Sequence, residues 1–425
     1  MDTILLITLS RHLSNGNNTN KLGGKMEQRF WDKLKRVKIS DLLHIFMLVA
    51  AFPISLFVRL FRRNIWLICD TRYEAGDNGF WLFKYIRENE KEVDVIFALD
   101  KKSKDYDKVK KLGKVVQYGS FMHWVYYLAA SKNVSSQKMG KPNAAICYVL
   151  EVYGLLKNKR AFLQHGIITA NLTFLHYANT KMKLFVTSTQ DEWKYVNDEY
   201  GYPEGCVQKL GLCRFDALHN DKEVKKQILI MPTWRMYIRN VMKSKDSQER
   251  LNQFKSTTYF KCWEQLIKDK EFLSFIERED IEVVFYPHRE MINFIEGFEI
   301  NHPRIRVETW ENADVQSKLI ESAILITDYS SVSMDFAYMK KPLIYYQFDK
   351  EEFRSKHHPK GYFTFEEDGF GPVCETAKDV VSYLMGYYQN GGFVNKEIYN
   401  QRHEKYFDLY DSNNCKRNFE AISRM

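Results

Sequence analysis

The sequence predicts an α/β protein with two domains, each built on a parallel sheet. Over most of its 425 residues, short apolar runs typical of strands alternate with amphipathic or polar stretches, which is the pattern of βαβ units. This alternation starts again near residue 206, after the turn-rich stretch 201–205 (GYPEG). A basic and partly apolar segment precedes the first of the two alternating regions. Together these features predict two Rossmann-like domains facing a cleft, preceded by a basic amphipathic helical segment that associates with a membrane.

The first domain is expected over residues 64–205. Its strands are apolar runs that end in polar residues, and its helices carry apolar side chains at helical spacing. Residues 144–150 (AAICYVL) fit either a helix or a strand. The expected strands are 64–70, 93–100, 114–119, 160–166 and 183–189, and the expected helices are 81–89 and 121–131.

The second domain is expected over residues 206–390. It repeats the alternation of strands and helices, and after Ala377 the pattern is mostly helical. We expect residues 391–425 to form a helix that packs back across the domains. The expected strands are 227–234, 281–288, 305–309, 323–328 and 342–349, and the expected helices are 261–279 and 330–341.

The N-terminal arm carries most of the excess positive charge. The chain has 63 Lys and Arg against 54 Asp and Glu, a net charge of +9. Residues 1–63 hold 11 of the basic and 4 of the acidic residues, so this arm alone contributes +7. The clustering favours attraction to an anionic membrane surface, with a solvated tail as the alternative. We expect residues 1–25 to be disordered and translation to begin at Met1 or at Met26, which directly precedes a helical pattern.

Residues 26–63 form the basic amphipathic segment. Within it, Leu42 to Val58 is an uncharged run of 17 residues. As a helix this run would be about 26 Å long, which is short of a roughly 30 Å hydrocarbon core. Pro53 interrupts the run, and basic residues flank both ends. We therefore expect an anchor that lies in the plane of the membrane, with a buried capping helix or a true span as alternatives.

The cysteines and several missing motifs exclude other classes of protein. Seven cysteines without a CxxC pair argue against a zinc ribbon or a disulfide scaffold and fit a reducing cytoplasm. Neither GxxxxGK[ST] nor GxGxxG after a strand occurs, which disfavours P-loop NTPases and dinucleotide oxidoreductases. Without HExxH or a carboxylate-rich cluster, we expect no metal and no required cofactor. No nucleic-acid-binding motif accompanies the basic arm, so nucleic acid is not an expected partner.

Residues 324–346 (ILITDYSSVSMDFAYMKKPLIYY) are the strongest candidate for binding an anion. A buried strand ends at Asp328, and a helix then opens with Ser330, the expected N-cap, and Ser331. The free N–H groups of a helix start attract phosphate, and two hydroxyl groups add donors. An ordinary capped helix is the alternative.

Two further strand ends carry histidines. In 162–167 (FLQHGI), His165 follows an apolar strand and precedes a glycine that allows close approach of a ligand. Histidine is a natural general base near neutral pH, although a lone histidine is more often structural. In 285–290 (FYPHRE), His288 and Arg289 could together neutralise a phosphate. Arg235, in 231–235 (MPTWR), stands at another strand end.

Two polar loops complete the set of candidates. Residues 360–373 (KGYFTFEEDGFGPV) form a glycine-rich acidic turn whose side chains could hold the hydroxyls of a sugar or of glycerol, with a solvated loop as the alternative. Residues 70–80 (DTRYEAGDNGF) follow the first strand of the body and bring Arg72, Asp77 and Asn78 to its carboxyl end. The alternative for this second loop is a polar turn in which Asp77 or Asn78 caps a helix.

Taken in this order, these segments resemble the CDP-glycerol glycerophosphotransferase family, whose members build teichoic acids and related capsular polymers. The resemblance covers about residues 64–390. It implies a scaffold like that of type-B glycosyltransferases, with the acceptor domain over 64–205 and the CDP-alcohol donor domain over 206–390. The segments that carry it are WLICDTRYEAGDNG, QHG, PTWR, PHR, TDYSSVSMDFAYMKKPLIYY and KGYFTFEEDGFGP.

The resemblance implies a reaction and a role for each candidate residue. A hydroxyl of a lipid-linked or polymer acceptor would attack the β-phosphate of a CDP-alcohol, and CMP would leave. The CDP-alcohol would be CDP-glycerol or CDP-ribitol. His165 matches the general base, and His288 would be the second catalytic residue. The other roles are donor phosphate binding by Arg235, Arg289, Asp328, Ser330 and Ser331, binding of the donor polyol by Lys360, Gly361 and Glu366, and contacts on the acceptor side by Arg72, Asp77, Asn78, Gln164 and Gly166.

The chain departs from the family pattern at three of these segments. It has QHGII where many members have WHGTP, and Met236 follows Arg235 where many have aspartate. It has KGYFTF where many have RGFYFD, so Lys360 keeps the charge of an arginine without its forked geometry. We expect binding of the donor tail to differ accordingly.

Other functions and the place of action follow from the same features. One alternative is a transferase that uses a nucleotide-sugar donor on the same scaffold, and another is a non-catalytic membrane scaffold of a polysaccharide assembly complex. The histidines, arginine and serines of the motifs argue against the non-catalytic scaffold. The basic arm predicts a peripheral protein at the cytoplasmic face of the cell membrane. The polyol, the acceptor and the choice between single addition and polymerisation stay open.

Overall fold

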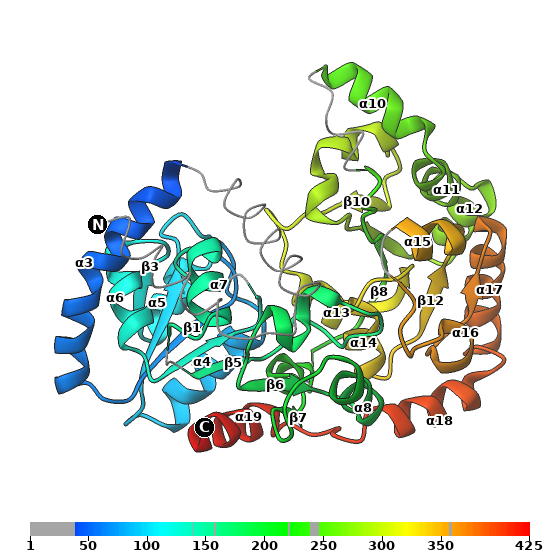
Figure 1. The fold of residues 1–425 in the computed structure, drawn as a ribbon. Helices are drawn as coiled ribbons and strands as arrows, with labels where there is room; N and C mark the ends of the chain where they lie inside the picture. The colour runs from blue at the N-terminus through cyan, green and yellow to red at the C-terminus, as the bar shows by residue number, and fades with distance from the viewer. Residues whose placement is uncertain (1–38, 139, 157–158, 220–221, 239–245, 357–358) are drawn as a thin grey trace, which may run out of the picture.

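Two parallel sheets organise the computed structural model of the chain (Figure 1). The structure describes residues 39–425 except 139, 157–158, 220–221, 239–245 and 357–358. The first sheet has seven strands in the order β3-β2-β1-β4-β5-β6-β7, and the second has six in the order β10-β9-β8-β11-β12-β13. The predicted fold class, two α/β domains with parallel sheets, is confirmed.

In the first domain, helices cover both faces of the sheet. Alternate residues of β1 enter different cores: Trp66 and Ile68 pack with α4, and Ile65 and Leu67 pack with α6. Apolar runs buried on both faces are what a parallel sheet requires. The strands are β1 Ile65–Cys69, β2 Asp94–Leu99, β3 Lys114–Gln117, β4 Lys132–Ser135, β5 Lys159–Phe162, β6 Leu184–Thr187 and β7 Val207–Lys209, and the helices are α4 Asn78–Asn89, α5 Tyr106–Leu112, α6 Phe121–Ala129, α7 Ala144–Val152 and α8 Gln190–Glu199.

The second domain is built in the same way. In β11, Ile324 and Ile326 enter one core and Leu325 enters the other. Its strands are β8 Lys225–Met231, β9 Glu282–Phe285, β10 Ile305–Val307, β11 Ser322–Thr327, β12 Leu343–Tyr346 and β13 Val373–Cys374. Its helices are α10 Ser247–Ser256, α11 Thr258–Ile267, α12 Lys270–Arg278, α13 Val315–Glu321, α14 Val332–Tyr338, α15 Lys350–Lys356, α16 Phe365–Asp368 and α17 Ala377–Asn390.

Two sequence-based expectations differ from the structure in detail, and the structure decides one that was left open. Strand β7 pairs with β6, so the first sheet runs past residue 205, where we placed the end of the first domain. Only Val207 of this short edge strand is buried, which explains its weak signal. The helix expected over 261–279 is two helices, because Asp269 caps a new one. The ambiguous stretch 144–150 lies in helix α7.

A 3₁₀ segment, η3 (Cys213–Leu218), joins the two domains. Cys213 packs in a core of the first domain, whereas Phe215 and Leu218 pack in a core of the second. The residue between them, Arg214, therefore stands where the two domains meet.

Helix α3 (Ile39–Phe61) lies along the first domain and packs on α6 and α7. It is continuous through Pro53, which we expected to interrupt it. Arg59 donates to the carbonyls of Leu128 and Ala129, which fixes the end of the helix to the domain. By length and composition alone, Asp41–Phe61 could cross a membrane, and little of it is buried. The predictions for residues 1–38 lie outside the described residues.

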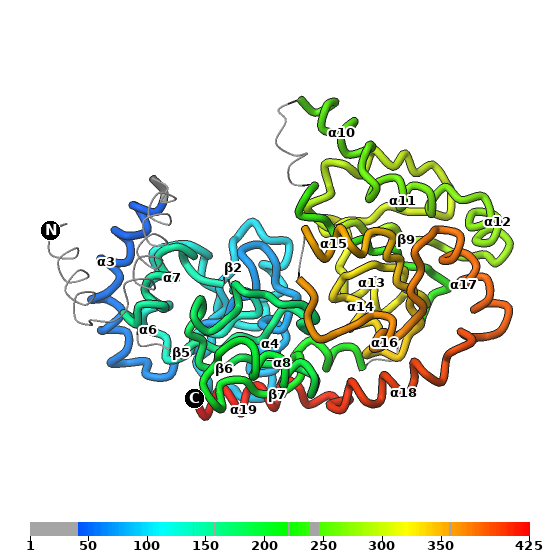
Figure 2. The backbone as a smooth tube through the Cα atoms, turned by 45° about the vertical axis from the view of Figure 1, so that its right-hand side comes forward, coloured from blue at the N-terminus to red at the C-terminus, as the bar shows by residue number. Residues whose placement is uncertain are grey.

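The C-terminal segment returns from the second domain to the first. Helices α18 (Lys396–Tyr406) and α19 (Asn414–Arg424) run along one side of both domains, as Figure 2 shows in red. Phe419 contacts Trp66 with ring centroids 5.5 Å apart, and Ile422 is buried in the core of the first domain. This segment therefore links the domains a second time, in addition to η3.

Candidate active site

The loop that follows β5 presents His165 in a strained turn. Gln164 has a φ of 69°, in the left-handed region that costs a non-glycine residue about 1–3 kcal/mol. Buried contacts hold this conformation, because the Gln164 carbonyl accepts from Asn78 Nδ2 at 2.7 Å and its Nε2 donates to Glu192 Oε1 at 3.0 Å. The side chain of His165 points outward and is 67% exposed.

Glu192 of α8 supports the same loop on both sides of His165. Besides Gln164, its Oε1 accepts from the backbone N–H of Ile168 at 2.7 Å, and its Oε2 accepts from that of Ser188 at 2.7 Å. Burial raises the pKa of this carboxyl to about 7, against the opposing effect of the hydrogen bonds. One buried side chain thus fixes the path of the loop.

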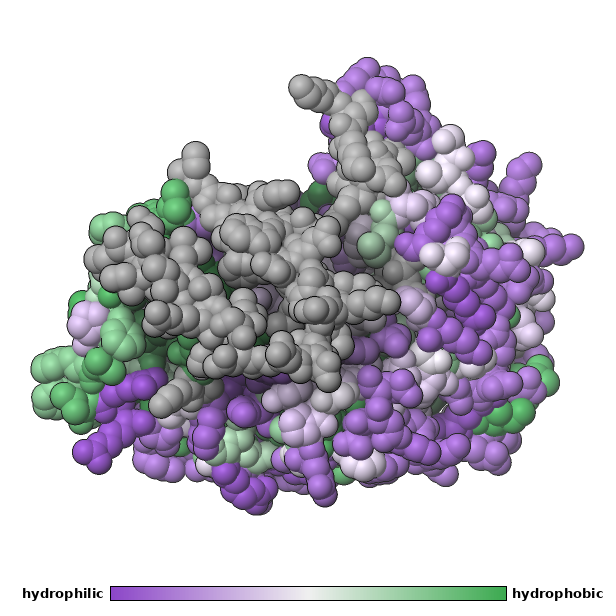
Figure 3. All heavy atoms as spheres, viewed as in Figure 1, coloured by the Kyte–Doolittle hydropathy of each residue, from purple (hydrophilic) through white to green (hydrophobic). Residues whose placement is uncertain are grey.

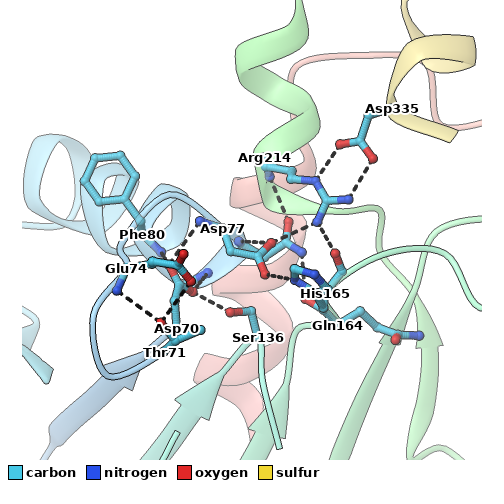
Figure 4. A network of polar contacts seen from close by, with 12 residues as sticks. Asp70, Thr71, Glu74, Asp77, Phe80, Ser136, Gln164, His165, Arg214 and Asp335 are labelled. Atoms are coloured by element: carbon cyan, nitrogen blue, oxygen red, sulfur yellow. Dashed lines mark hydrogen bonds and ion pairs between the residues drawn. The ribbon is translucent and has the colours of Figure 1, made fainter. Parts of the chain in front are cut away.

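His165 pairs with Asp77, the N-cap of α4 (Figure 4). Asp77 Oδ2 lies 2.6 Å from His165 Nδ1, while Oδ1 accepts from the N–H of Asn78. Desolvation lowers the pKa of His165, but the charge and the hydrogen bond of Asp77 together outweigh this effect, so that pKa is raised. Burial raises the pKa of Asp77, and the effects of His165 and Arg214 outweigh it, so that pKa lies below its usual range.

Arg214 binds groups of both domains. Its Nη1 lies 2.8 Å from Asp77 Oδ1 and also donates to the carbonyl of His165. Its Nε and Nη2 contact the two carboxylate oxygens of Asp335, on α14, at 2.6 and 2.8 Å. Its backbone N–H donates to Asn78 Oδ1 at 2.9 Å. The pKa of Arg214 is raised, because the two carboxylates outweigh the effect of burial.

A buried carboxyl, Asp70, fixes the start of α4 and with it Asp77. It follows β1 and accepts from the backbone N–H groups of Asp77, Gly79 and Phe80 and from the hydroxyl of Ser136. Burial and the nearby charge of Asp77 raise the pKa of Asp70 to about 7. A Cβ at Gly79 would lie 2.3 Å from Asp70 Oδ1, so the position requires glycine.

The His165 loop touches the start of α14 across the domain junction. A Cβ at Gly166 would lie 3.0 Å from both Cβ and Oγ of Ser331, so the side chain of Ser331 packs closely against Gly166. Ser331, and not Ser330, is the N-cap of α14, and its side chain makes no capping hydrogen bond. Ser330 instead uses its carbonyl to accept from Ser333. The structure thus brings the QHG and DYSS segments together, as their strand ends suggested.

His288 and Arg289 open η4 (Arg289–Phe298) at the same junction. The ring of His288 stacks on Trp234, with centroids 6.1 Å apart. Burial and the positive charges of Arg289 and His165 lower the pKa of His288 to about 4. Arg289 lies 3.5 Å from Glu74 of the first domain and packs over the ring of Trp310.

Arg235 and Asp328, predicted to bind donor phosphate, are buried and paired with each other. Arg235 is 0% exposed, and its guanidinium contacts Asp328 at 2.9 Å and Asp349 at 2.8 Å. Asp328 also accepts from the N–H groups of Thr233 and Tyr329. These contacts favour a structural role that holds the strand ends of the second domain together. The sequence motif showed the arginine but could not show Asp349 beside it.

The remaining predicted residues occupy both sides of the junction. Lys360 is exposed, and its backbone forms an isolated antiparallel β-bridge with Ala170 of the first domain. Gly361 packs so closely on Thr169 that a Cβ would lie 2.3 Å from its carbonyl oxygen. Glu366 pairs with Lys350 at 2.5 Å. Arg72 donates to Asp100 at 2.9 Å, which turns it away from His165 and towards the β2 side of the sheet.

Sequence reasoning missed four charged residues of this site. Two of them, Arg214 and Asp335, pair with each other although they are 121 residues apart in the chain. The missed residues are Asp70, Glu192, Arg214 and Asp335. Asp70 lies in the motif WLICDTRYEAGDNG and Asp335 in TDYSSVSMDFAYMKKPLIYY, so these two could have been selected from the sequence. Among the residues that the structure describes, no group of three or more His, Cys, Asp or Glu side chains could hold a metal ion.

Comparisons with solved structures show a shared fold. The wall teichoic acid polymerase TagF superposes with a TM-score of 0.59 at 14% identity, over 85% of this chain and 89% of that one. UDP-GlcNAc 2-epimerase from Neisseria meningitidis, solved with UDP-GlcNAc, gives a TM-score of 0.52 at 11% identity. At these identities the likeness concerns the two-domain scaffold alone.

Comparisons with curated sequences and family models go further. The minor teichoic acid biosynthesis protein GgaB of Bacillus subtilis is 34% identical over 388 residues, which are 88% of this chain and 41% of that protein. The chain thus spans about two fifths of GgaB. The teichoic acid poly(glycerol phosphate) polymerase of Bacillus spizizenii is 24% identical over 77% of this chain and 85% of its own length. Residues 50–424 match the model of the CDP-glycerol:poly(glycerophosphate) glycerophosphotransferases, and the chain belongs to that family.

Proposed function

We propose that the chain transfers glycerol phosphate, or a related polyol phosphate, from a CDP-alcohol to a hydroxyl of a lipid-linked or polymer acceptor. The observation that carries this proposal is the pairing of the exposed His165 with Asp77 at the domain junction. There the loop of His165 meets the start of α14, and Arg289 of η4 contacts the first domain. Family membership supplies the class of donor, and the two relatives point to teichoic acid synthesis.

His165 would act as the general base. Because Nδ1 is held by Asp77, the free Nε2 faces outward and can take the proton of the acceptor hydroxyl. The acceptor oxygen then bonds to the β-phosphorus of the donor, the bond from that phosphorus to the bridging oxygen breaks, and CMP leaves with the electron pair. The negative charge of Asp77 stabilises the imidazolium that forms.

The second domain would bind the donor phosphates. Arg289 presents a cation, and His288 is neutral at pH 7 because its pKa is near 4, so it can donate one N–H. Ser331 lies beside Gly166 of the His165 loop, and the hydroxyls of Ser330 and Ser331 would donate to the donor phosphates. Phosphoryl transfer depends on such positioning and charge neutralisation more than on covalent help. In this account Arg235 and Asp328 support the site from within the domain.

Helix α3 would hold the protein on the cytoplasmic face of the membrane. Ala51 and Ser55 face the domain, whereas the opposite side is apolar and exposed, as Figure 3 shows in green along the left edge. A helix fixed along the domain cannot cross a bilayer in this arrangement, so an in-plane anchor fits better than a span. The exposed residues include Leu42, Leu43, Phe46, Val49, Phe52, Phe57, Leu60 and Phe61.

CMP release by the purified chain tests the function. We would supply CDP-glycerol, CDP-ribitol or a panel of nucleotide sugars, each with membrane lipid extract, and expect CMP from one CDP-alcohol. H165A should lose about 10²–10⁴-fold in rate. H302Q, which changes a histidine that pairs with Glu277 in the second domain, is the matched control and should keep its activity. Turnover of a sugar donor would indicate a glycosyltransferase, and near-normal turnover by H165A would remove its role.

A further inference from the structure

Arg214 is placed to connect the second domain to the His165–Asp77 pair. It lies on η3, the segment whose side chains are shared between a core of each domain. On one side its guanidinium binds Asp77 and the carbonyl of His165, and on the other it binds Asp335 through two parallel contacts. This bidentate arginine–carboxylate pairing fixes the orientation of the guanidinium, and a lysine could not reproduce it.

The three charged side chains that lead to His165 are largely shielded from water. The side chains of Arg214, Asp77 and Asp335 are 11%, 14% and 5% exposed, so their interactions are only weakly screened. Asp335 belongs to the same short helix whose N-cap, Ser331, touches Gly166. The second domain therefore contacts the His165 loop both directly, through Ser331, and indirectly, through Asp335 and Arg214.

We infer that Arg214 is a positioning residue that couples docking of the second domain to the competence of His165. With Asp335 in place, Arg214 holds Asp77 and the His165 backbone in one arrangement, so the base is aligned only when the donor side is docked. The inference deepens the proposed function and rests on His165 being the base. It predicts that the two partners of a single ion pair, Arg214 and Asp335, affect His165 in opposite ways.

The opposite effects follow from charge. The charged groups that act on His165 are Asp77 from α4, Arg214 from η3 and Asp335 from α14, and His165 in turn acts on His288 before η4. The positive charge of Arg214 lowers the pKa of His165, and the negative charge of Asp335 raises it. R214Q should therefore raise this pKa and D335N should lower it. Mere loosening of the domain junction would move the pKa in the same direction in both variants.

NMR titration of the histidine side chains in the full chain measures the pKa of His165 without substrate. The result therefore does not depend on whether the proposed donor is correct. The His165 signal is assigned by its loss in H165N. We expect the pKa of His165 to rise in R214Q, to fall in D335N and to stay unchanged in R417Q. Arg417 is the matched control, because it binds Asp411 through both oxygens in the C-terminal link. Shifts of the same sign in R214Q and D335N, or none, would overturn the inference.

The variant R214K separates the geometry of the Arg214 contacts from the positive charge of the side chain. It also provides a test of the inference if R214Q does not fold. Lysine keeps the cation but cannot bind Asp77 and Asp335 at once. We expect the pKa of His165 to stay near that of the unchanged protein, while kcat falls by about 10- to 100-fold, as a misplaced catalytic group commonly causes. The KM for the donor should change less than kcat. A kcat equal to that of the unchanged protein would contradict the positioning role.

Discussion

At the scale of the residue, His165 depends on Asp77 for its orientation and for its charge state. The contact of 2.6 Å engages Nδ1, so the proposed proton transfer would use Nε2, and the carboxylate raises the pKa of the ring. A base works in its neutral form, so activity should increase as the pH rises through this raised pKa. The acidic limb of the pH profile thus reports on the pair.

The variant D77N removes the negative charge of Asp77 and keeps the shape of its side chain. Without the carboxylate the pKa of His165 should fall, so the acidic limb of kcat/KM should move to lower pH. At the same time kcat should drop by about 10- to 100-fold, because the ring loses its oriented partner. The pH profiles of both proteins, measured with the productive donor, check this. An acidic limb that stays in place would mean that Asp77 does not control the titration of His165.

At the scale of the element, α3 combines an anchored side with an apolar one. Arg59 and Arg62 fix its C-terminal end, Arg62 through an ion pair with Asp94, and Trp124 donates from Nε1 to His44 Nδ1 at 3.0 Å near its beginning. The opposite side is exposed over the whole length of the helix. Phe46 is 80% and Phe61 is 73% exposed, so each can bury most of its ring in a lipid interface.

The double variant F46S/F61S should bind lipid vesicles less tightly. Burial of one phenylalanine contributes about 1.5–3 kcal/mol, so the loss of two should weaken binding by at least about 100-fold. Co-sedimentation with vesicles of anionic phospholipid measures it. V394S is the control, because Val394 is 89% exposed but lies between α17 and α18, far along the chain from α3. Equal binding by F46S/F61S would show that α3 is not the membrane contact.

At the scale of the whole molecule, activity should depend on how closely the two domains meet. Gly166 brings the His165 loop close to Ser331, at the start of α14 in the second domain. The Cβ added in G166A would lie 3.0 Å from the side chain of Ser331, so one of the two residues must move by a few tenths of an ångström. Because a shift of about 1 Å can cost about 10²-fold in rate, we expect kcat/KM to fall roughly 3- to 10-fold.

Steady-state kinetics and thermal unfolding of G166A, measured together, distinguish misalignment from unfolding. G386A serves as the control, since a Cβ at Gly386 of α17 would meet only Asn390, at 4.0 Å. Its kcat/KM should equal that of the unchanged protein. If G166A is as active as G386A, the approach of the two domains at this point does not matter for the reaction.

The sequence predicts those parts of the site that follow strands. His165 and the serines before α14 each come directly after an apolar strand, and the carboxyl ends of parallel strands face the same way, so their convergence could be expected. Arg214 could not be found in this way. It stands on a 3₁₀ segment after a short edge strand, and its partners are distant in the chain.

Burial is the other property that the sequence does not reveal. Arg235 follows a strand just as His165 does, yet it is enclosed between Asp328 and Asp349, whereas His165 is exposed. Likewise, Leu42 to Val58 reads as one apolar run, and only the packing on α6 shows which side is covered. Residue type and position in the strand order limit the candidates, and tertiary contacts decide among them.

The central claim is that His165 activates an acceptor hydroxyl for attack on a CDP-alcohol. Phosphorus NMR of a reaction with CDP-glycerol and a lipid-linked acceptor tests it most directly, because it follows loss of the diphosphate and growth of the product together. We predict that CMP and a new phosphodiester appear at equal rates with the unchanged protein and with H302Q, and that both are reduced about 10²–10⁴-fold with H165A. Phosphodiester formation by H165A at the normal rate would contradict the account.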